Sequence, residues 1–328
     1  METNKNVIFF GNGLNRVSKG LNWQELIKKV SGPNYIEGLS NTLQYDVAFL
    51  RNEFNYKGDS SISPEENDFK KRLADEIVKS LKSTLISEVY QKLAAMPVKD
   101  YITTNYDYCL ENALRANGYN PDESEKEKEQ HQLIPYIKEN AYSLHRFHAF
   151  TKKDGAEDKI KRIWYIHGEA KKPASIMLGY NQYGSTLGRM ANYYYGKDLY
   201  KSLGTLQNRL SSLSTNEPKS WIDLFYSKNI YIIGYGLDNA EIDIWWLLGK
   251  RARMSQNRHQ NRRLPHINFY EKGSMDKQLV AKQKALAAFG VATNIKSISQ
   301  AEKNELNKAY AKYYLETLEE INNSIKQH

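Results

Sequence analysis

The chain has 328 residues, of which 40% are hydrophobic and 12% aromatic. It is therefore long enough for one large α/β domain with insertions and too apolar to be disordered. A mean hydropathy of -0.71 and the absence of any apolar run near the ~18 residues of a membrane helix predict no transmembrane segment. The N-terminal apolar stretch is too short for a signal peptide, so a cytoplasmic protein is expected.

Seven short apolar runs are the predicted strands. Their apolar residues are consecutive rather than alternating, as expected for parallel strands covered on both faces. Helical patterns separate them, which predicts a Rossmann-like α/β fold with a doubly wound, mainly parallel sheet of six to seven strands. The predicted strands are residues 7–10, 101–104, 163–166, 175–178, 230–233, 267–270 and 292–295.

Helices are predicted between the strands. Asn22 and Asp238 resemble N-caps, because each has a glutamate three residues later and apolar residues at helical spacing after it. Two stretches are longer than a crossover needs and are interpreted as helical insertions that form a lid, residues 36–98 and 180–219. Further helices are predicted at 66–95 and 300–325, and exposed loops at 117–131, 151–161 and 211–219.

Cysteine content and charge limit the kinds of site that the chain can contain. Cys109 is the only cysteine, which excludes an internal disulfide and a multi-cysteine zinc site. The net charge of +9 has a local source at residues 250–263, which are interpreted as a solvated helix face or as a contact for a partner or nucleic acid. No DNA-reading motif accompanies this stretch. Its cations are Lys250, Arg251, Arg253, Arg258, Arg262 and Arg263.

A glycine-containing turn follows the first predicted strand. Gly11 and Gly13, with Asn12 between them and Asn15 after them, would let the backbone approach a diphosphate, with loop amides and a following helix N-terminus supplying positive potential. A strand-to-helix turn needs glycine without any ligand as well, so a purely structural turn remains an alternative. The dehydrogenase pattern Gly-x-Gly-x-x-Gly is not met, because position 16 is arginine.

Polar residues end the second and third strands. Asn105 and Asp107 lie one residue apart and face the same side. A carboxamide can donate to and accept from ribose hydroxyls, and a carboxylate can accept from an amide, although both residues also form turns. His167 suits a general base, because imidazole titrates near neutral pH. His145 and His148 lie in a mixed polar and aromatic stretch and are interpreted as structural.

A second glycine turn, Gly234-Tyr235-Gly236 with Asp238, follows the strand at 230–233. It is interpreted as a site for the adenosine side of a dinucleotide, or as a structural turn alone. The carboxyl ends of parallel strands share one edge of a sheet, and ligands bind in the crevice outside it. Together these strand ends predict a dinucleotide cleft with a candidate base.

The order of these segments carries a family resemblance. They are Phe10 to Asn15 with Ser18, Gly20 and Trp23, then Thr104 to Asp107, then Tyr165 to Gly168, then Leu178 to Tyr180 with Tyr183, then Ile233 to Gly236 with Asp238 and Asp243. This set resembles the sirtuin-like (silent-information-regulator-type) domain of bacterial antiphage defence effectors, over roughly residues 5–300. The resemblance implies that Asn105 and His167 are the catalytic pair and that Asp107 lies near nicotinamide. Residues expected to bind the dinucleotide are Gly11, Asn12, Gly13, Asn15, Thr104, Gly234, Tyr235, Gly236 and Asp238.

Departures from the protein-deacylating sirtuins refine the expected activity. A single cysteine cannot build their four-cysteine zinc ribbon, and Asn12 and Thr104 replace their usual alanine and glutamine. The resemblance therefore implies an NAD+ glycohydrolase without a metal, which cleaves its substrate NAD+ to nicotinamide and ADP-ribose and depletes NAD+ in infected cells. A protein deacylase or ADP-ribosyltransferase, and a non-catalytic sensor of NAD+ or ADP-ribose, are the alternatives.

Regulation and domain organisation follow from the same resemblance. A constitutive NAD+ hydrolase would be toxic, so activation by a signal or partner is expected. The resemblance implies a homo-oligomer or a separate ATPase or nucleic-acid-guided sensor subunit. Residues 1–300 are expected to form the catalytic domain and residues 300–328 a C-terminal helix.

Overall fold

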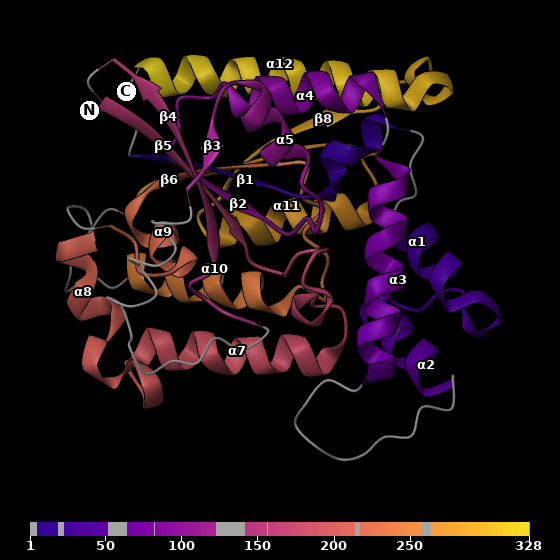
Figure 1. Cartoon of the computed structure of the whole chain (residues 1–328), viewed down its shortest axis with the longest axis horizontal. Helices are drawn as coiled ribbons and strands as arrows, with labels where there is room; N and C mark the ends of the chain where they lie inside the picture. The colour runs from indigo at the N-terminus through magenta and orange to yellow at the C-terminus, as the bar shows by residue number, and fades with distance from the viewer. Residues whose placement is uncertain are drawn as a thin grey trace.

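An eight-stranded sheet forms the centre of the computed structural model (Figure 1). The structure describes residues 5–18, 23–51, 64–81, 83–122, 142–155, 157–213, 217–256 and 264–327. The strands follow the order β3-β4-β5-β2-β1-β6-β7-β8, in which neighbours from β5 to β8 are parallel and β3 and β4 are antiparallel additions at one edge. The predicted α/β fold with a mainly parallel sheet is thus confirmed, with eight strands in place of the predicted six to seven because β3 and β4 extend one edge. The strands are β1 (Asn6–Phe10), β2 (Asp100–Thr103), β3 (Asn120–Pro121), β4 (Phe147–Asp154), β5 (Glu157–Tyr165), β6 (Asn229–Ile233), β7 (Ile267–Gly273) and β8 (Ala292–Ser297).

The direction of winding reverses at β1. From β1 the chain adds β2 and β5 on one side, and it then crosses to add β6, β7 and β8 on the other. In such sheets the strand ends at the reversal diverge and leave a crevice that binds ligands. The turns after β1 and β6 are therefore at the position where a ligand site is expected.

Helices cover both faces of the sheet, as the alternation of side chains in β1 requires. Val7 and Phe9 pack against one layer, which includes α9 and α10, whereas Ile8 and Phe10 pack against α4, α5 and α12. In Figure 1, α12 and α4 lie above the sheet and α7 and α10 below it. Among the described residues, no helix is long and apolar enough to cross a membrane. The helices of these layers are α4 (Thr84–Ala94), α5 (Cys109–Ala116), α7 (Tyr180–Tyr195), α8 (Leu206–Leu213), α9 (Trp221–Ser227), α10 (Ile242–Ser255), α11 (Lys277–Ala288) and α12 (Leu306–Gln327), with short 3-10 helices η4 (Asp198–Leu203) and η5 (Glu302–Glu305).

A separate helical lobe packs beside the carboxyl ends of the strands. Leu26, Tyr45 and Phe69 from three helices form a third apolar cluster, which also contains Tyr106 from the segment after β2. Figure 1 shows this lobe at one side of the sheet. Part of the predicted insertion 36–98 thus forms a wall beside the predicted cleft. The lobe contains α1 (Trp23–Ser31), η2 (Gly32–Asn34), α2 (Asn41–Arg51) and α3 (Pro64–Ser80).

One predicted strand and one predicted loop are wrong. Residues 175–178 are not a strand: η3 (Pro173–Ser175) leads into buried residues that pack against the helical lobe, and the Met177 N–H donates to the carbonyl of His167. Residues 151–161 are not a loop, because β4 and β5 pair as a long antiparallel hairpin there. An apolar run shows that a segment is buried but not which backbone it pairs with. The exposed, charged tip of this hairpin resembles a loop in sequence.

Candidate active site at the reversal of the sheet

The two glycine turns predicted from the sequence are in direct contact. Gly13 donates its N–H to the carbonyl oxygen of Gly234 at 2.6 Å. A Cβ at Gly13 would lie 2.5 Å from that oxygen, and Gly234 has a φ of +63°, so both positions need glycine. The Gly13 N–H is thus occupied by the hydrogen bond between the two turns. The short η1 (Asn12–Val17) stands in place of the predicted α-helix. The close backbone approach joins the two halves of the sheet at the crevice.

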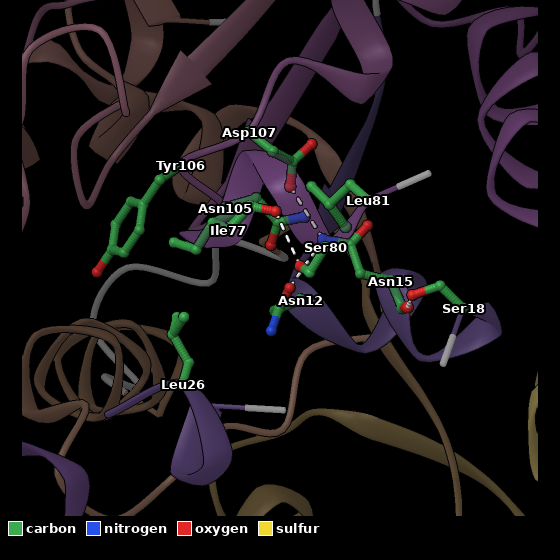
Figure 2. Close-up of a pocket in the computed structure, with 10 residues that line it drawn as sticks. All are labelled: Asn12, Asn15, Ser18, Leu26, Ile77, Ser80, Leu81, Asn105, Tyr106 and Asp107. Atoms are coloured by element: carbon green, nitrogen blue, oxygen red, sulfur yellow. Dashed lines mark hydrogen bonds between the residues drawn. The ribbon is translucent and has the colours of Figure 1, made fainter. Parts of the chain in front are cut away.

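A network of side chains joins this loop to the end of β2 (Figure 2). The Asn15 amide donates to Asn12 at 2.8 Å and to a carboxylate oxygen of Asp107 at 2.9 Å. The hydroxyl of Tyr90, on α4, donates to the Asn15 oxygen at 3.0 Å and accepts from the Asn105 amide at 3.1 Å. Asn15 therefore joins Asn12 to Asp107, and the buried Tyr90 joins Asn15 to Asn105.

A cavity of about 20 Å³ borders this network, which is room for about one water molecule. Asn105 lines it, and the buried Asn105 Oδ1 has no hydrogen-bond partner among the described residues. Leu26 of α1 and Ile77 of α3 line it as well (Figure 2). An unpartnered amide oxygen beside such a space can hold a water molecule or a ribose hydroxyl.

His167 lies at the end of β5 and is paired with a buried acid. Its Nε2 lies 2.9 Å from Oδ2 of Asp243, in the first turn of α10, and its ring meets the edge of Tyr183 at 5.4 Å between centroids. Burial lowers the pKa of His167, but the Asp243 carboxylate, with a smaller contribution from Glu241, outweighs burial, so the pKa is raised above the ordinary 6.5. Gly168, with a φ of +96°, turns the chain sharply just after the histidine. The pair fits a base whose imidazolium form is stabilised by a fixed carboxylate.

A larger cleft of about 640 Å³ joins these parts. Asn12, Asn15 and Tyr106 line both the small cavity and the cleft, so the two spaces adjoin. Asn105 and Asp107 line the small cavity only. Gly11 lines neither space and packs against Tyr235. The predicted residues that line the cleft are Asn12, Gly13, Asn15, Thr104, His167, Gly234, Tyr235, Gly236 and Asp238.

Comparison with known proteins assigns the sequence to a family. The family model described as a SIR2-like domain matches residues 99–291, more than half of the chain. The chain belongs to the SIR2-like family. It is also similar to two proteins named NAD(+) hydrolase ThsA. The one from Cytobacillus dafuensis is 27% identical over 42% of this chain and 26% of the relative, and the one from Acinetobacter baumannii (strain 532279) is 26% identical over 56% of this chain and 32% of the relative. The match thus spans about a third or less of each relative.

Three residues that contact the candidate site were not predicted to belong to it. Tyr90 lies in a predicted insertion, and nothing in its surroundings marks it. Asp243 appears in the family pattern without a role, although its place in the first turn of a helix after a glycine loop is a usable signal. Glu241 lines the cleft, where burial raises its pKa to about 7, His167 opposes the rise and Asp243 adds to it. Its carboxylate accepts the Asp238 N–H at 2.7 Å.

The C-terminal helix α12, which lies outside the SIR2-like match, also borders the cleft. Tyr310 and Tyr314 of α12 line it together with Arg16, which stands where a dehydrogenase loop has its third glycine. The Arg16 guanidinium donates to the Tyr310 hydroxyl at 3.1 Å and lies over its ring. A cation is thus held at the cleft edge, close to the loop after β1.

The predicted basic face at 250–263 needs correction. Arg251 is buried and donates to the backbone carbonyls of Phe225 and Pro265, so it joins α10 to neighbouring segments instead of facing solvent. Arg253 is exposed, and Lys250 contacts aromatic side chains of α7 and α10. Residues 257–263, which contain three of the six cations, lie outside the described residues.

Proposed function

We propose that this SIR2-like protein is an NAD+ glycohydrolase, which converts NAD+ and water to nicotinamide and ADP-ribose. The observation that carries the proposal is the placement of the Asn105 amide and the His167–Asp243 pair on adjoining parts of one cleft at the reversal of the sheet. The similarity to two proteins named NAD(+) hydrolase ThsA supports the same activity.

The chemistry needs few groups. The bond between ribose C1′ and the nicotinamide nitrogen breaks with its electron pair going to the pyridinium ring, which leaves as a neutral molecule without a general acid. Water forms the new bond to C1′ and gives its proton to neutral His167. Asn105 orients this water or the ribose hydroxyls through its free oxygen.

The remaining predicted residues position NAD+ in this proposal. Asp107 already accepts from Asn15 and from the Cys109 N–H, and its carboxylate oxygens have further lone pairs for the nicotinamide amide. The turn after β6 takes the adenosine side, and Arg16 at the cleft edge meets the diphosphate. The nicotinamide end then lies near the small cavity.

Product analysis tests the proposal. Purified protein with NAD+, with and without candidate activators, should release nicotinamide and ADP-ribose in equal amounts, without acetylated peptide. Turnover should also persist in EDTA. A strict requirement for an acyl-lysine peptide would indicate a deacylase instead. Binding of NAD+ or ADP-ribose without any turnover would indicate the sensor.

Replacing Asp243 by asparagine should shift the acid limb of the kcat/KM profile to lower pH. Activity requires neutral His167, so it rises as pH passes the His167 pKa. Without the carboxylate, burial lowers that pKa. The plateau should fall as well, because asparagine does not stabilise the imidazolium formed during proton transfer. Initial rates across pH measure both effects, and a limb at the wild-type position would contradict the assignment.

The physiological role is proposed from the family resemblance. NAD+ depletion would serve antiphage defence by abortive infection, with activity released by a signal, a partner subunit or assembly into a homo-oligomer. Light scattering and NAD+ levels in phage-challenged cells, for wild type and His167→Gln, test this role. Equal protection by both proteins would contradict it.

A further inference from the structure

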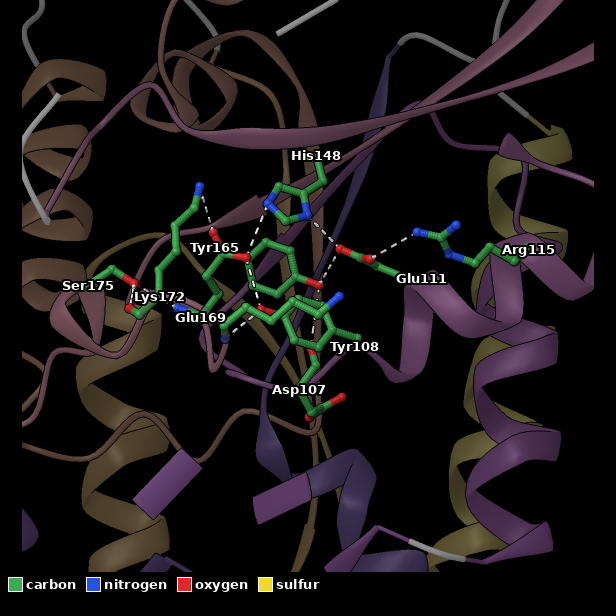
Figure 3. Close-up of polar contacts among 10 residues, drawn as sticks. Asp107, Tyr108, Glu111, Arg115, His148, Tyr165, Glu169, Lys172 and Ser175 are labelled. Atoms are coloured by element: carbon green, nitrogen blue, oxygen red, sulfur yellow. Dashed lines mark hydrogen bonds and ion pairs between the residues drawn. The ribbon is translucent and has the colours of Figure 1, made fainter. Parts of the chain in front are cut away.

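His148, on β4, sits between two buried carboxylates (Figure 3). Its Nδ1 lies 2.6 Å from Oε1 of Glu111, and its Nε2 lies 3.2 Å from Oε2 of Glu169, an ion-pair contact off the hydrogen-bond direction. The Glu111 and Glu169 side chains are 5% and 1% exposed. We propose that the His148 imidazolium clamps the loop with Asp107 to the turn with His167. It is thus a positioning residue, a role that rests on the proposed NAD+ cleavage.

The clamp needs the protonated ring. A neutral imidazole has one N–H, so it can donate to only one of the two carboxylates, and its other nitrogen would present a lone pair to the second. Burial lowers the pKa of His148, but Glu111 and Glu169 outweigh burial and raise it. Burial acts to raise the pKa of Glu169, yet His148 and the other donors around it hold that pKa at about 2. Ring and carboxylates therefore stabilise one another's charged forms.

Other polar groups face the two carboxylates but do not lie between them. Two are cations at the rim, and two are tyrosine hydroxyls. The cationic side chains are about half exposed, so water screens them. The four groups are Lys172 at 3.3 Å and Tyr108 at 3.0 Å from Glu169, and Arg115 at 3.9 Å and Tyr165 at 3.2 Å from Glu111. The Tyr165 ring also lies 5.0 Å from the imidazole.

Each carboxylate is joined by a short segment to a proposed site residue. Glu111 lies in the first turn of α5, and Cys109, which opens that helix, donates its N–H to Asp107 at 2.9 Å. Glu169 lies two residues after His167. The Ala170 N–H also joins the two segments, because it donates to the Tyr106 carbonyl at 2.9 Å. Releasing the clamp would therefore loosen the Asp107 loop against the His167 turn without separating them. A displacement near 1 Å at reacting groups can lower a rate about 10²-fold.

The sign of the pH effect follows from the raised pKa. The clamp is fully present below the ordinary histidine pKa of 6.5, and it is lost as pH rises through the higher folded value. Turnover should then fall on the alkaline side. The His167 base produces a fall on the acid side, so the two histidines act on opposite limbs of the profile.

Selective labels test the clamp without any turnover. Because Cys109 is the only cysteine, ¹⁵N-cysteine labelling gives a single amide resonance that reports on its contact with Asp107. Labelling with ¹³C-histidine follows the His148 ring. We expect the Cys109 resonance to titrate together with His148, and this titration to disappear in His148→Gln. A ring that is already neutral below pH 6.5, or a Cys109 resonance independent of it, overturns the clamp.

Kinetics test the positioning role. His148→Gln should lower kcat by about ten- to a hundredfold with little change in KM, and it should remove the alkaline limb. Glu169→Gln is the compensating variant: a neutral His148 can donate to Glu111 and accept from the new amide. It should keep more of the wild-type kcat than His148→Gln does, without the alkaline fall. His145→Gln is the matched control, because His145 contacts the Lys219 carbonyl at 2.5 Å.

The two sets of results separate the clamp from the proposed function. Coupled titration in a protein that does not cleave NAD+ supports the clamp and contradicts the glycohydrolase. Turnover in the wild type, with kcat and pH profile unchanged in His148→Gln, overturns the positioning role and leaves the glycohydrolase standing.

Discussion

Replacing His167 by glutamine should lower kcat for NAD+ cleavage by about 10²- to 10⁴-fold, the usual contribution of a general base. Glutamine keeps an N–H donor for the buried Asp243 carboxylate but cannot take a proton from water. Alanine would leave that carboxylate unpaired and destabilise the protein, which makes glutamine the sharper test. Initial rates of nicotinamide release, together with melting curves, measure the effect.

Two further variants serve as comparisons for His167→Gln. Asn105→Ala should also lose most activity, because it removes the free amide oxygen beside the small cavity. His145→Gln should keep wild-type rates. A comparable loss in His145→Gln, or wild-type rates in folded His167→Gln, would contradict the assignment of His167 as the base.

Replacing Asp100 by alanine should lower the free energy of unfolding by about 3–5 kcal/mol, the usual cost of breaking a buried ion pair. Asp100 begins β2 and accepts from Arg162 at 2.7 and 2.9 Å and from the Trp164 indole at 3.0 Å. Without it, the fully buried Arg162 loses two charge-assisted hydrogen bonds and keeps its ion pair with half-exposed Glu217. Urea unfolding at neutral pH measures the change.

A surface pair provides the control for this stability prediction. Lys308 and Glu305 lie 2.8 Å apart, with side chains 65% and 63% exposed. Lys308→Ala should leave the unfolding midpoint nearly unchanged, because water screens exposed pairs. Equal midpoints for Asp100→Ala and Lys308→Ala would show that the buried pair contributes no more than the surface pair.

The central strands could be predicted from local pattern. Residues 7–10 and 230–233 are apolar without interruption and end in glycine turns, and the structure places β1 and β6 there. A strand covered on both faces must be apolar at every position, so its pattern is unambiguous. The hairpin of β4 and β5 was missed because charged residues fill its tip, whereas its apolar residues, such as Phe147 and Phe150, lie near its base and pack on opposite faces of the sheet. The run 175–178 was wrongly predicted as a strand because it is apolar and buried, and burial alone does not specify a strand.

At the candidate site, sequence pattern placed Gly13, Asn105 and His167 on one edge, because parallel strands share their carboxyl ends. The partners of these residues could not be predicted. Tyr90 reaches Asn105 from α4, and Asp243 reaches His167 across 76 positions of the chain. Strand ends follow from the local sequence, whereas hydrogen-bond partners depend on which distant side chains folding brings within about 3 Å. The pKa shifts depend in addition on burial, because charges interact more strongly away from water.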